Sequence, residues 1–183
     1  MTEPLFKASG KVSWFGGPAD KGVSPSEGLA FIYQYSTAPY LFLDKQPPNT
    51  TGLARRLDPE VFYVACRWDY AKTPKSMLAT SEQALVQAGD KKFLAWPSDW
   101  GPHTSTGRVA DISPGLMGAL GIKTDDSVEV TYPAPAEAEM EIAEGEAAVH
   151  AVMARERPPV PPLLAKLKER RAAKPKKAKP RKR

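Results

Sequence analysis

The sequence predicts a mainly β domain followed by a separate basic arm, and three observations lead to this prediction. The apolar segments are short, and several alternate polar with apolar residues, which is the period of a half-buried strand. The chain contains 19 prolines in 183 residues, and proline interrupts helices and favours turns. Residues 166–183 hold 11 of the 26 Lys and Arg residues but only one of the 21 acids, so a strongly basic tail follows a mildly acidic body.

The N-terminal half contains four candidate strands separated by loop-like segments. Lys11–Phe15 alternates in polarity and is followed by a Gly-Gly-Pro turn, which ends a strand. Leu29–Tyr35 and the shorter Leu41–Leu43 are apolar. Residues 44–60 are rich in Pro, Asn, Thr and Gly, which predicts a loop, whereas Val61–Tyr70 is aromatic and β-branched, which favours a strand.

The middle of the chain has a weaker pattern. Ser76–Thr80 and Lys92–Trp96 are short strand candidates. Residues 81–88 fit either a helical turn or a strand, because a short apolar run has no decisive period.

A strand, a capped helix and a closing strand are predicted next. Arg108–Ile112 alternates in polarity, and Ser113 is a candidate N-cap with proline at the first helical position. The short amphipathic helix that follows ends at Gly121, a suitable C′ residue. Val128–Tyr132 alternates again and is the predicted closing strand.

The C-terminal part is expected to lie outside this domain. A Pro-Ala-Pro sequence begins at Pro133, and residues 136–155 are rich in Ala and Glu, which predicts a helix. Residues 157–162 form a polyproline-like spacer, and the tail of residues 166–183 is expected to be disordered because it cannot bury a core. No internal repeat is visible in the sequence.

Residues 99–102 and 107–114 form a recognisable pattern. They read Asp-Trp-Gly-Pro, then a short loop, then Gly-Arg-Val-Ala-Asp-Ile-Ser-Pro, followed by Ala-Leu-Gly and a valine-rich strand. This pattern resembles the core of the rare-lipoprotein-A (RlpA-like) double-psi β-barrel family. Residues 12–16 are similar to the family's Ala-Ser-Trp-Tyr-Gly opening, and residues 24–28 lie where the family has a Thr-Ala-x-Gly-Glu segment.

The resemblance implies a six-stranded double-psi β-barrel similar to that of expansins and lytic transglycosylases. The barrel would span residues 10–133, with residues 1–9 as a lead-in and residues 36–91 as an elaborated or inserted region. The expected fold is therefore a mainly β, six-stranded double-psi β-barrel with a short helix after Ser113. A helical segment and Pro-rich spacer (134–165) and a disordered basic tail would follow.

Members of these families cleave or bind β-1,4 glycans, and RlpA-like members act on peptidoglycan. Glycan cleavage needs a proton donor and usually a second carboxylate or a stabilising group. The resemblance points to Asp111, Asp99 and Glu27 as candidate catalytic residues, because all three fall on or next to acidic positions of the family. Asp111 matches the aspartate that supplies the general acid in related glycan-cleaving barrels. We expect one of Asp99 and Asp111 to be the acid, and the other, or Glu27, to stay ionised.

Four further residues are candidates for substrate binding. His103 could orient a carboxylate or contact a sugar, and Arg108 belongs to the family-like Gly-Arg segment. Trp100 and Trp14 offer flat apolar surfaces for the C–H face of a pyranose.

Each candidate also has a structural explanation. Asp111 precedes a strand-to-helix turn, where aspartate often caps backbone amides, and Asp99 next to Gly-Pro suits a turn. Glu27 and His103 lie in predicted loops, where a solvated side chain is the ordinary case. Trp14 could belong to the core.

Composition limits the cofactors and the location. The single cysteine, Cys66, excludes an intramolecular disulfide, and two histidines with one cysteine are too few for a standard zinc site, so no cofactor or metal is expected. No signal peptide, lipobox or membrane-length apolar run is visible. The expected location is therefore cytoplasmic at synthesis, followed by association with a virion or release on lysis.

Two functions from different classes remain open at this point. The first is a protein that cleaves or binds cell-wall glycan (peptidoglycan), similar to a lytic transglycosylase and derived from a phage or prophage. The second is a non-catalytic double-psi barrel, a structural or binding module whose basic tail docks to nucleic acid or another anionic partner.

Overall fold

The computed structural model describes residues 3–22, 35–79 and 82–142. The chain divides into two compact units, Met1–Glu144 and Gly145–Arg183, and every described residue lies in the first. The candidate residue Glu27, the spacer and the basic tail lie outside the described residues.

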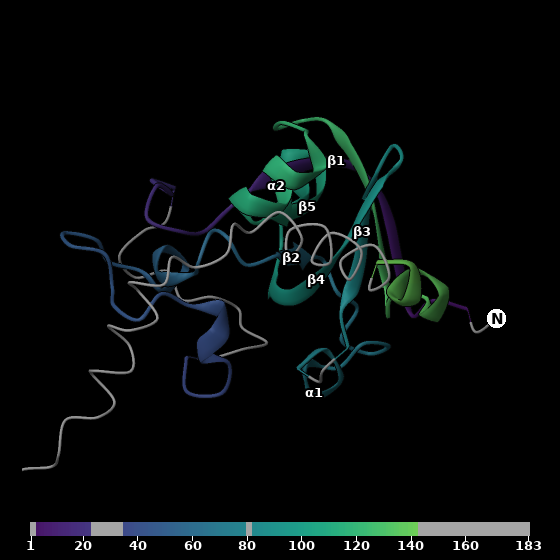
Figure 1. Cartoon of the computed structure of the whole chain (residues 1–183), viewed down its shortest axis with the longest axis horizontal. Coiled ribbons are helices and arrows are strands. Elements are labelled where there is room, and N and C mark those ends of the chain that lie inside the picture. The colour runs from purple at the N-terminus through teal and green to yellow at the C-terminus, as the bar shows by residue number, and fades with distance from the viewer. Residues whose placement is uncertain (1–2, 23–34, 80–81, 143–183) are drawn as a thin grey trace, which may run out of the picture. The chain divides into compact units, whose positions relative to one another are not determined.

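Six strands close into a barrel in the order β1-β5-β2-β4-β3-β6 (Figure 1). β1 runs parallel to β5 and β2 runs parallel to β4, whereas the other neighbouring strands are antiparallel. The predicted mainly β fold with a closed six-stranded barrel is therefore confirmed. The strands are β1 (Phe6–Trp14), β2 (Tyr63–Cys66), β3 (Ala84–Ala88), β4 (Lys91–Trp100), β5 (Arg108–Ile112) and β6 (Ser127–Tyr132).

The two halves of the barrel are interlocked and equivalent. Exchanging β1, β2 and β3 with β4, β5 and β6 leaves the circular strand order unchanged. Helix α1 (Lys75–Leu78) follows β2, just as helix α2 (Pro114–Leu120) follows β5, and the two helices lie on opposite sides of the strands in Figure 1. Because β5 separates β1 from β2, and β2 separates β5 from β4, the β1–β2 and β4–β5 connections each join strands that are not neighbours.

Helix α2 forms where its sequence signals predict it. The Ser113 hydroxyl accepts a hydrogen bond from the amide of Leu116 at 3.2 Å, and Pro114 occupies the start of the helix. Gly121 ends the helix in the left-handed region at φ 73°. Residues 136–142 are also helical, so the described part of the predicted 136–155 helix is confirmed.

Two short strand predictions are wrong. Ser76–Thr80 was predicted as a strand, but residues 75–78 form α1. Residues 39–41 form the 3-10 helix η1 (Pro39–Leu41), and Phe42 makes a single antiparallel bridge with Leu57. Runs this short carry no period that separates helix from strand, so tertiary packing decides. The 81–88 segment, which fitted either a helical turn or a strand, contains strand β3. Within the strand predicted over residues 61–70, only the four residues of β2 form a strand.

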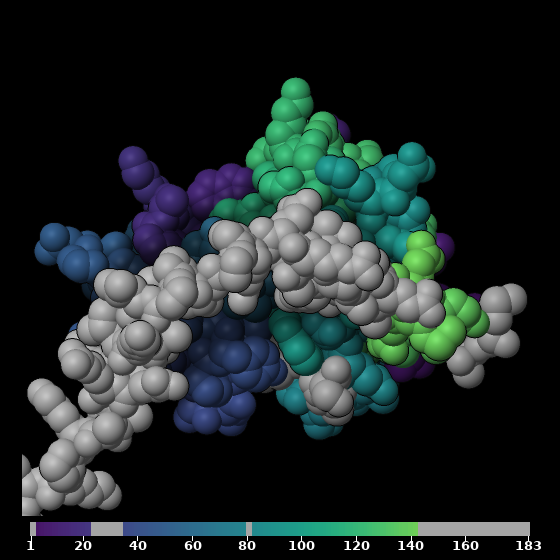
Figure 2. Space-filling view, in the orientation of Figure 1, coloured from purple at the N-terminus to yellow at the C-terminus, as the bar shows by residue number. Residues whose placement is uncertain are grey.

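Residues 36–91 supply two of the six barrel strands, β2 and β3, and long stretches outside these strands. The remainder, including η1 and η2 (Leu53–Arg56), builds a second apolar cluster around Leu41, Leu57 and Tyr63. Residues 35–61, drawn in blue, extend to one side of the barrel strands (Figures 1 and 2). At the other boundary, β1 begins at Phe6, inside the expected lead-in.

The main core fills the barrel. Its fully buried members include Val12, Val64, Ile112 and Val130, one from each of four strands. Among the residues that the structure describes, no helix is long and apolar enough to cross a membrane.

Candidate functional site

A row of four residues crosses four adjacent strands of the barrel. Ser13 pairs with Asp111, Asp111 pairs with Ala65, and Ala65 pairs with Asp99. Both chain neighbours of Asp111 belong to the barrel core. Because side chains alternate along a strand, the row points to the outer side of the barrel. We call these four residues the outer row.

Asp111 is the most perturbed carboxyl group of the outer row. Burial raises its pKa from 3.8 to about 6; the cations of Arg108 and Arg67 oppose this shift, and the negative charge of Asp20 adds to it. Within residues 3–22, 35–79 and 82–142, no hydrogen-bond donor contacts its carboxylate, so the group does not act as an amide cap there. A carboxyl group with this pKa is partly protonated in mild acid and can donate a proton.

The second carboxylate near Asp111 belongs to Asp20, which the sequence analysis did not single out. Its Oδ2 accepts the amide of Gly16 at 2.7 Å and its Oδ1 accepts the amide of Gly22 at 2.8 Å. Arg55 Nε donates to the Asp20 backbone carbonyl at 2.7 Å. These contacts fix the carboxylate on the connection between β1 and β2. The Gly-Gly-Pro turn before Asp20 was visible in the sequence, but its closeness to Asp111 was not.

The loop that carries Asp20 packs closely on β2. Gly16 has φ +83°, and a Cβ at this position would lie 2.5 Å from the Tyr63 hydroxyl oxygen. That hydroxyl donates to the Phe15 carbonyl at 3.0 Å, and burial, with smaller contributions from Asp20 and Asp58, raises its pKa. The loop is therefore held by both its backbone and a buried tyrosine.

Asp99 and Asp111 lie on two strands that β2 separates. Asp99 lies within β4, and its Oδ1 accepts the amide of Trp100 at 2.7 Å. Ala65 separates the two aspartates, so their Cα atoms are two strand spacings, roughly 10 Å, apart. The charges that shift the pKa of Asp111 come from Arg108, Asp20 and Arg67 instead.

The two candidate tryptophans do not face the same way as the outer row. Trp14 ends β1 directly after Ser13, and Trp100 ends β4 directly after Asp99, so alternation turns both rings to the other side of their strands. They are 38% and 39% exposed, and they occupy equivalent positions in the two halves of the barrel. Trp100 Nε1 also donates to the Trp68 carbonyl at 3.1 Å.

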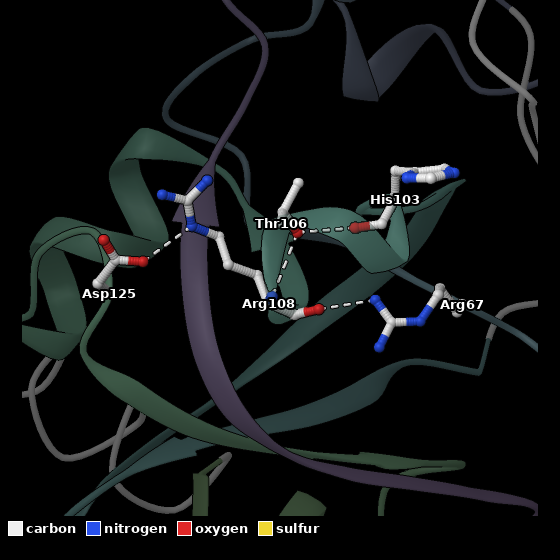
Figure 3. A network of polar contacts seen from close by, with 5 residues as sticks. All are labelled: Arg67, His103, Thr106, Arg108 and Asp125. Carbon is white, nitrogen blue, oxygen red and sulfur yellow. Dashed lines mark hydrogen bonds and ion pairs between the residues drawn. The ribbon is translucent and has the colours of Figure 1, made fainter.

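His103 and Arg108 belong to a polar network around the β4–β5 connection (Figure 3). His103 Nδ1 accepts the amide of Ser105 at 3.3 Å and caps η3 (Thr104–Thr106). Arg108 Nε donates to Asp125 Oδ1 at 3.0 Å, and this bond lowers the pKa of Asp125. Both side chains therefore have structural contacts that sequence reasoning did not predict.

No protein-family model matches the chain, and no curated protein matches its sequence. The likeness to RlpA-like barrels therefore rests on the residues themselves, chiefly 99–102 and 107–114. In the described ranges 3–22, 35–79 and 82–142, no group of three or more His, Cys, Asp or Glu side chains could hold a metal ion.

Proposed function

We propose that the barrel cleaves a cell-wall glycan, with Asp111 as the general acid. One observation carries the proposal: Asp111 lies on the outer side of the barrel, is not used as an amide cap by the described residues, and has a pKa raised to about 6. The resemblance of residues 107–114 to RlpA-like proteins points to the same residue and to peptidoglycan as the substrate class. Release by lysis would bring a phage-derived protein of this kind to the cell wall.

The arrangement favours a lytic transglycosylase reaction over hydrolysis by two cooperating carboxylates. Asp111 would donate its proton to the glycosidic oxygen as the bond to the anomeric carbon breaks. A hydroxyl of the same sugar would then bond to that carbon and return its proton to the Asp111 carboxylate, so no water is consumed. A single acid is sufficient for this reaction, which fits an Asp99 whose carboxylate already accepts the Trp100 amide.

Asp20 would supply the negative charge that such a reaction uses. The transition state has oxocarbenium character, and a fixed carboxylate nearby stabilises it. The amides of Gly16 and Gly22 hold the Asp20 carboxylate in place, so it would not have to reorganise during the reaction.

Incubation of the full chain with purified peptidoglycan tests the proposal. We expect soluble fragments whose terminal sugar carries an intramolecular anhydro bond. Mass spectrometry would detect each fragment as one water lighter than the corresponding hydrolysis product. The rate should fall above about pH 6 as Asp111 ionises, and Asp111→Asn should abolish it. Asp90→Asn, a change in the exposed β3–β4 turn, is the matched control and should remain active. Absence of fragments from the wild type at every pH from about 4 to about 8 contradicts the proposal.

A non-catalytic binding module is the second candidate, and specific contacts favour it. Asp99 and His103 each accept a hydrogen bond from a backbone amide, and Arg108 pairs with Asp125. Three of the expected site residues therefore make structural contacts. Binding of the inactive wild type to nucleic acid, lost on truncation after Pro162 and weakened by salt, would support this candidate. Binding to peptidoglycan that survives the same truncation would assign the interaction to the barrel.

A further inference from the structure

Arg67 joins the two ends of the connection between β4 and β5. Its Nη1 donates to the carbonyl of Pro102 at 2.9 Å and to the carbonyl of Arg108 at 2.7 Å. Figure 3 shows the second bond, in which the side chain of Arg67 reaches the backbone of Arg108. A single guanidinium nitrogen thus bridges Pro102, near the start of this connection, and Arg108, the first residue of β5. Hydrogen bonds from a charged donor are stronger than neutral ones.

The residues between these anchors have mainly local bonds. The amide of Thr106 donates to the His103 carbonyl at 3.0 Å, and the amide of Gly107 donates to the Thr104 carbonyl at 3.2 Å. Residues 103–107 are all exposed. At the start of the connection, the Gly101 amide donates to the Cys66 carbonyl at 3.2 Å. Arg67 is therefore the side chain that ties the far end of the connection to β2.

Arg67 also lies beside the outer row. It directly follows β2, two residues after Ala65, which pairs with Asp111. Its positive charge is one of those that oppose the raised pKa of Asp111. The other ionisable groups that face Asp111 are Arg108 on the same strand and Asp20 on the β1–β2 connection. Burial raises the pKa of the Cys66 thiol, and the charge of Asp111 adds to this shift.

We propose that Arg67 is a positioning residue, which holds residues 102–108 against β2 and so keeps one wall of the Asp111 site in place. The role of the wall in glycan cleavage rests on the function proposed above, whereas the tie itself is a property of the folded barrel. Loss of Arg67 should release the segment without unfolding the strands.

The test compares Arg67→Gln and Arg67→Lys with the wild type in the full chain. Backbone order at Thr104 to Gly107, measured by ¹⁵N relaxation, should fall from about 0.85 to below about 0.6 in Arg67→Gln and remain unchanged in β6. The midpoint of the Asp111 carboxyl titration, followed by ¹³C NMR, should rise by roughly half a pH unit. Arg67→Lys keeps the charge on a shorter side chain, so it should loosen the segment and leave the titration near that of the wild type.

Arg56→Gln is the matched control. Arg56 also donates to two backbone carbonyls, those of Leu43 and Asp44, but its charge is not among those that shift the pKa of Asp111. It should change neither readout. An unchanged order parameter at residues 104–107 in both Arg67 variants overturns the proposal, as does an equal loss of order in β6. If Arg67→Gln does not fold, the order parameter at residues 104–107 in Arg67→Lys decides whether the proposal stands. Neither readout uses a substrate, so failure of the cleavage assay leaves this result standing.

Discussion

Replacement of Asp111 by asparagine is expected to stabilise the barrel at neutral pH and to change its stability little in acid. The pKa of Asp111 rises from 3.8 to about 6 on folding, so the folded state binds this proton more tightly than the unfolded state. Below pH 3.8 both states are protonated and no penalty exists. Between pH 3.8 and about 6 the unfolded state ionises while the folded state keeps its proton, so the free energy of unfolding falls as the pH rises. Asparagine has a similar size and never ionises.

The size of the effect follows from the same two pKa values. The difference of about 2 units corresponds to roughly 3 kcal/mol, because one unit is about 1.4 kcal/mol. Asp111 keeps some contact with water, which screens its charge, so we expect about 1–2 kcal/mol in the free energy of unfolding. For a domain of this size the increase in Tm would be roughly 3–8 °C at neutral pH.

Urea denaturation in steps from about pH 3.5 to about pH 8 measures this difference for the wild type and the variant. The gap should open between pH 4 and pH 6 and stay constant above that range, because both states are then ionised. Asp90→Asn, in an exposed turn, should change the free energy of unfolding little at any pH. A gap between Asp111→Asn and the wild type that does not depend on pH would refute the raised pKa and remove the basis for a general acid.

Two further predictions concern the local signals that build the fold, and both are read from urea denaturation. Ser113→Ala removes the N-cap of α2 and should cost about 1 kcal/mol, whereas Ser76→Ala at an exposed position should cost little; equal costs would contradict the capping role. Gly16→Ala places a Cβ 2.5 Å from the Tyr63 hydroxyl oxygen and should cost more than about 2 kcal/mol. The same change at Gly89, which also has positive φ but an open surrounding, should cost about 1 kcal/mol, and a similar loss at both sites would argue against the close contact.

Local sequence signals predicted the second half of the barrel well. Arg108–Ile112, the Ser113 cap, the Gly121 helix end and the closing strand are each encoded within a few residues, through a two-residue period or a specific capping side chain. The short segments 41–43 and 76–80 lack such signals. Their conformation depends on what they pack against, so sequence reasoning assigned them wrongly.

The equivalence of the two halves was also hidden in the sequence. Ser13-Trp14 and Asp99-Trp100 occupy corresponding places at the ends of β1 and β4, yet they share only the tryptophan. A register shift between the residue pairs of β2 and β4 also changes the spacing on β4. The two halves share their strand pairing but few residue identities, so a single sequence does not reveal the repeat.

The sequence by itself determined that the chain forms a β-rich body with a basic tail, and that Asp111 stands at the end of a strand before a capped helix. These features depend on residue type and short spacing. Only the tertiary structure decided which groups surround Asp111, because the closed order β1-β5-β2-β4 brings Asp20, Arg67 and Asp111 together from three distant parts of the chain. The same order puts Ala65 between Asp99 and Asp111. The burial of the Asp111 carboxyl group and the charges around it depend on which strands become neighbours in the barrel. No short sequence pattern encodes that arrangement.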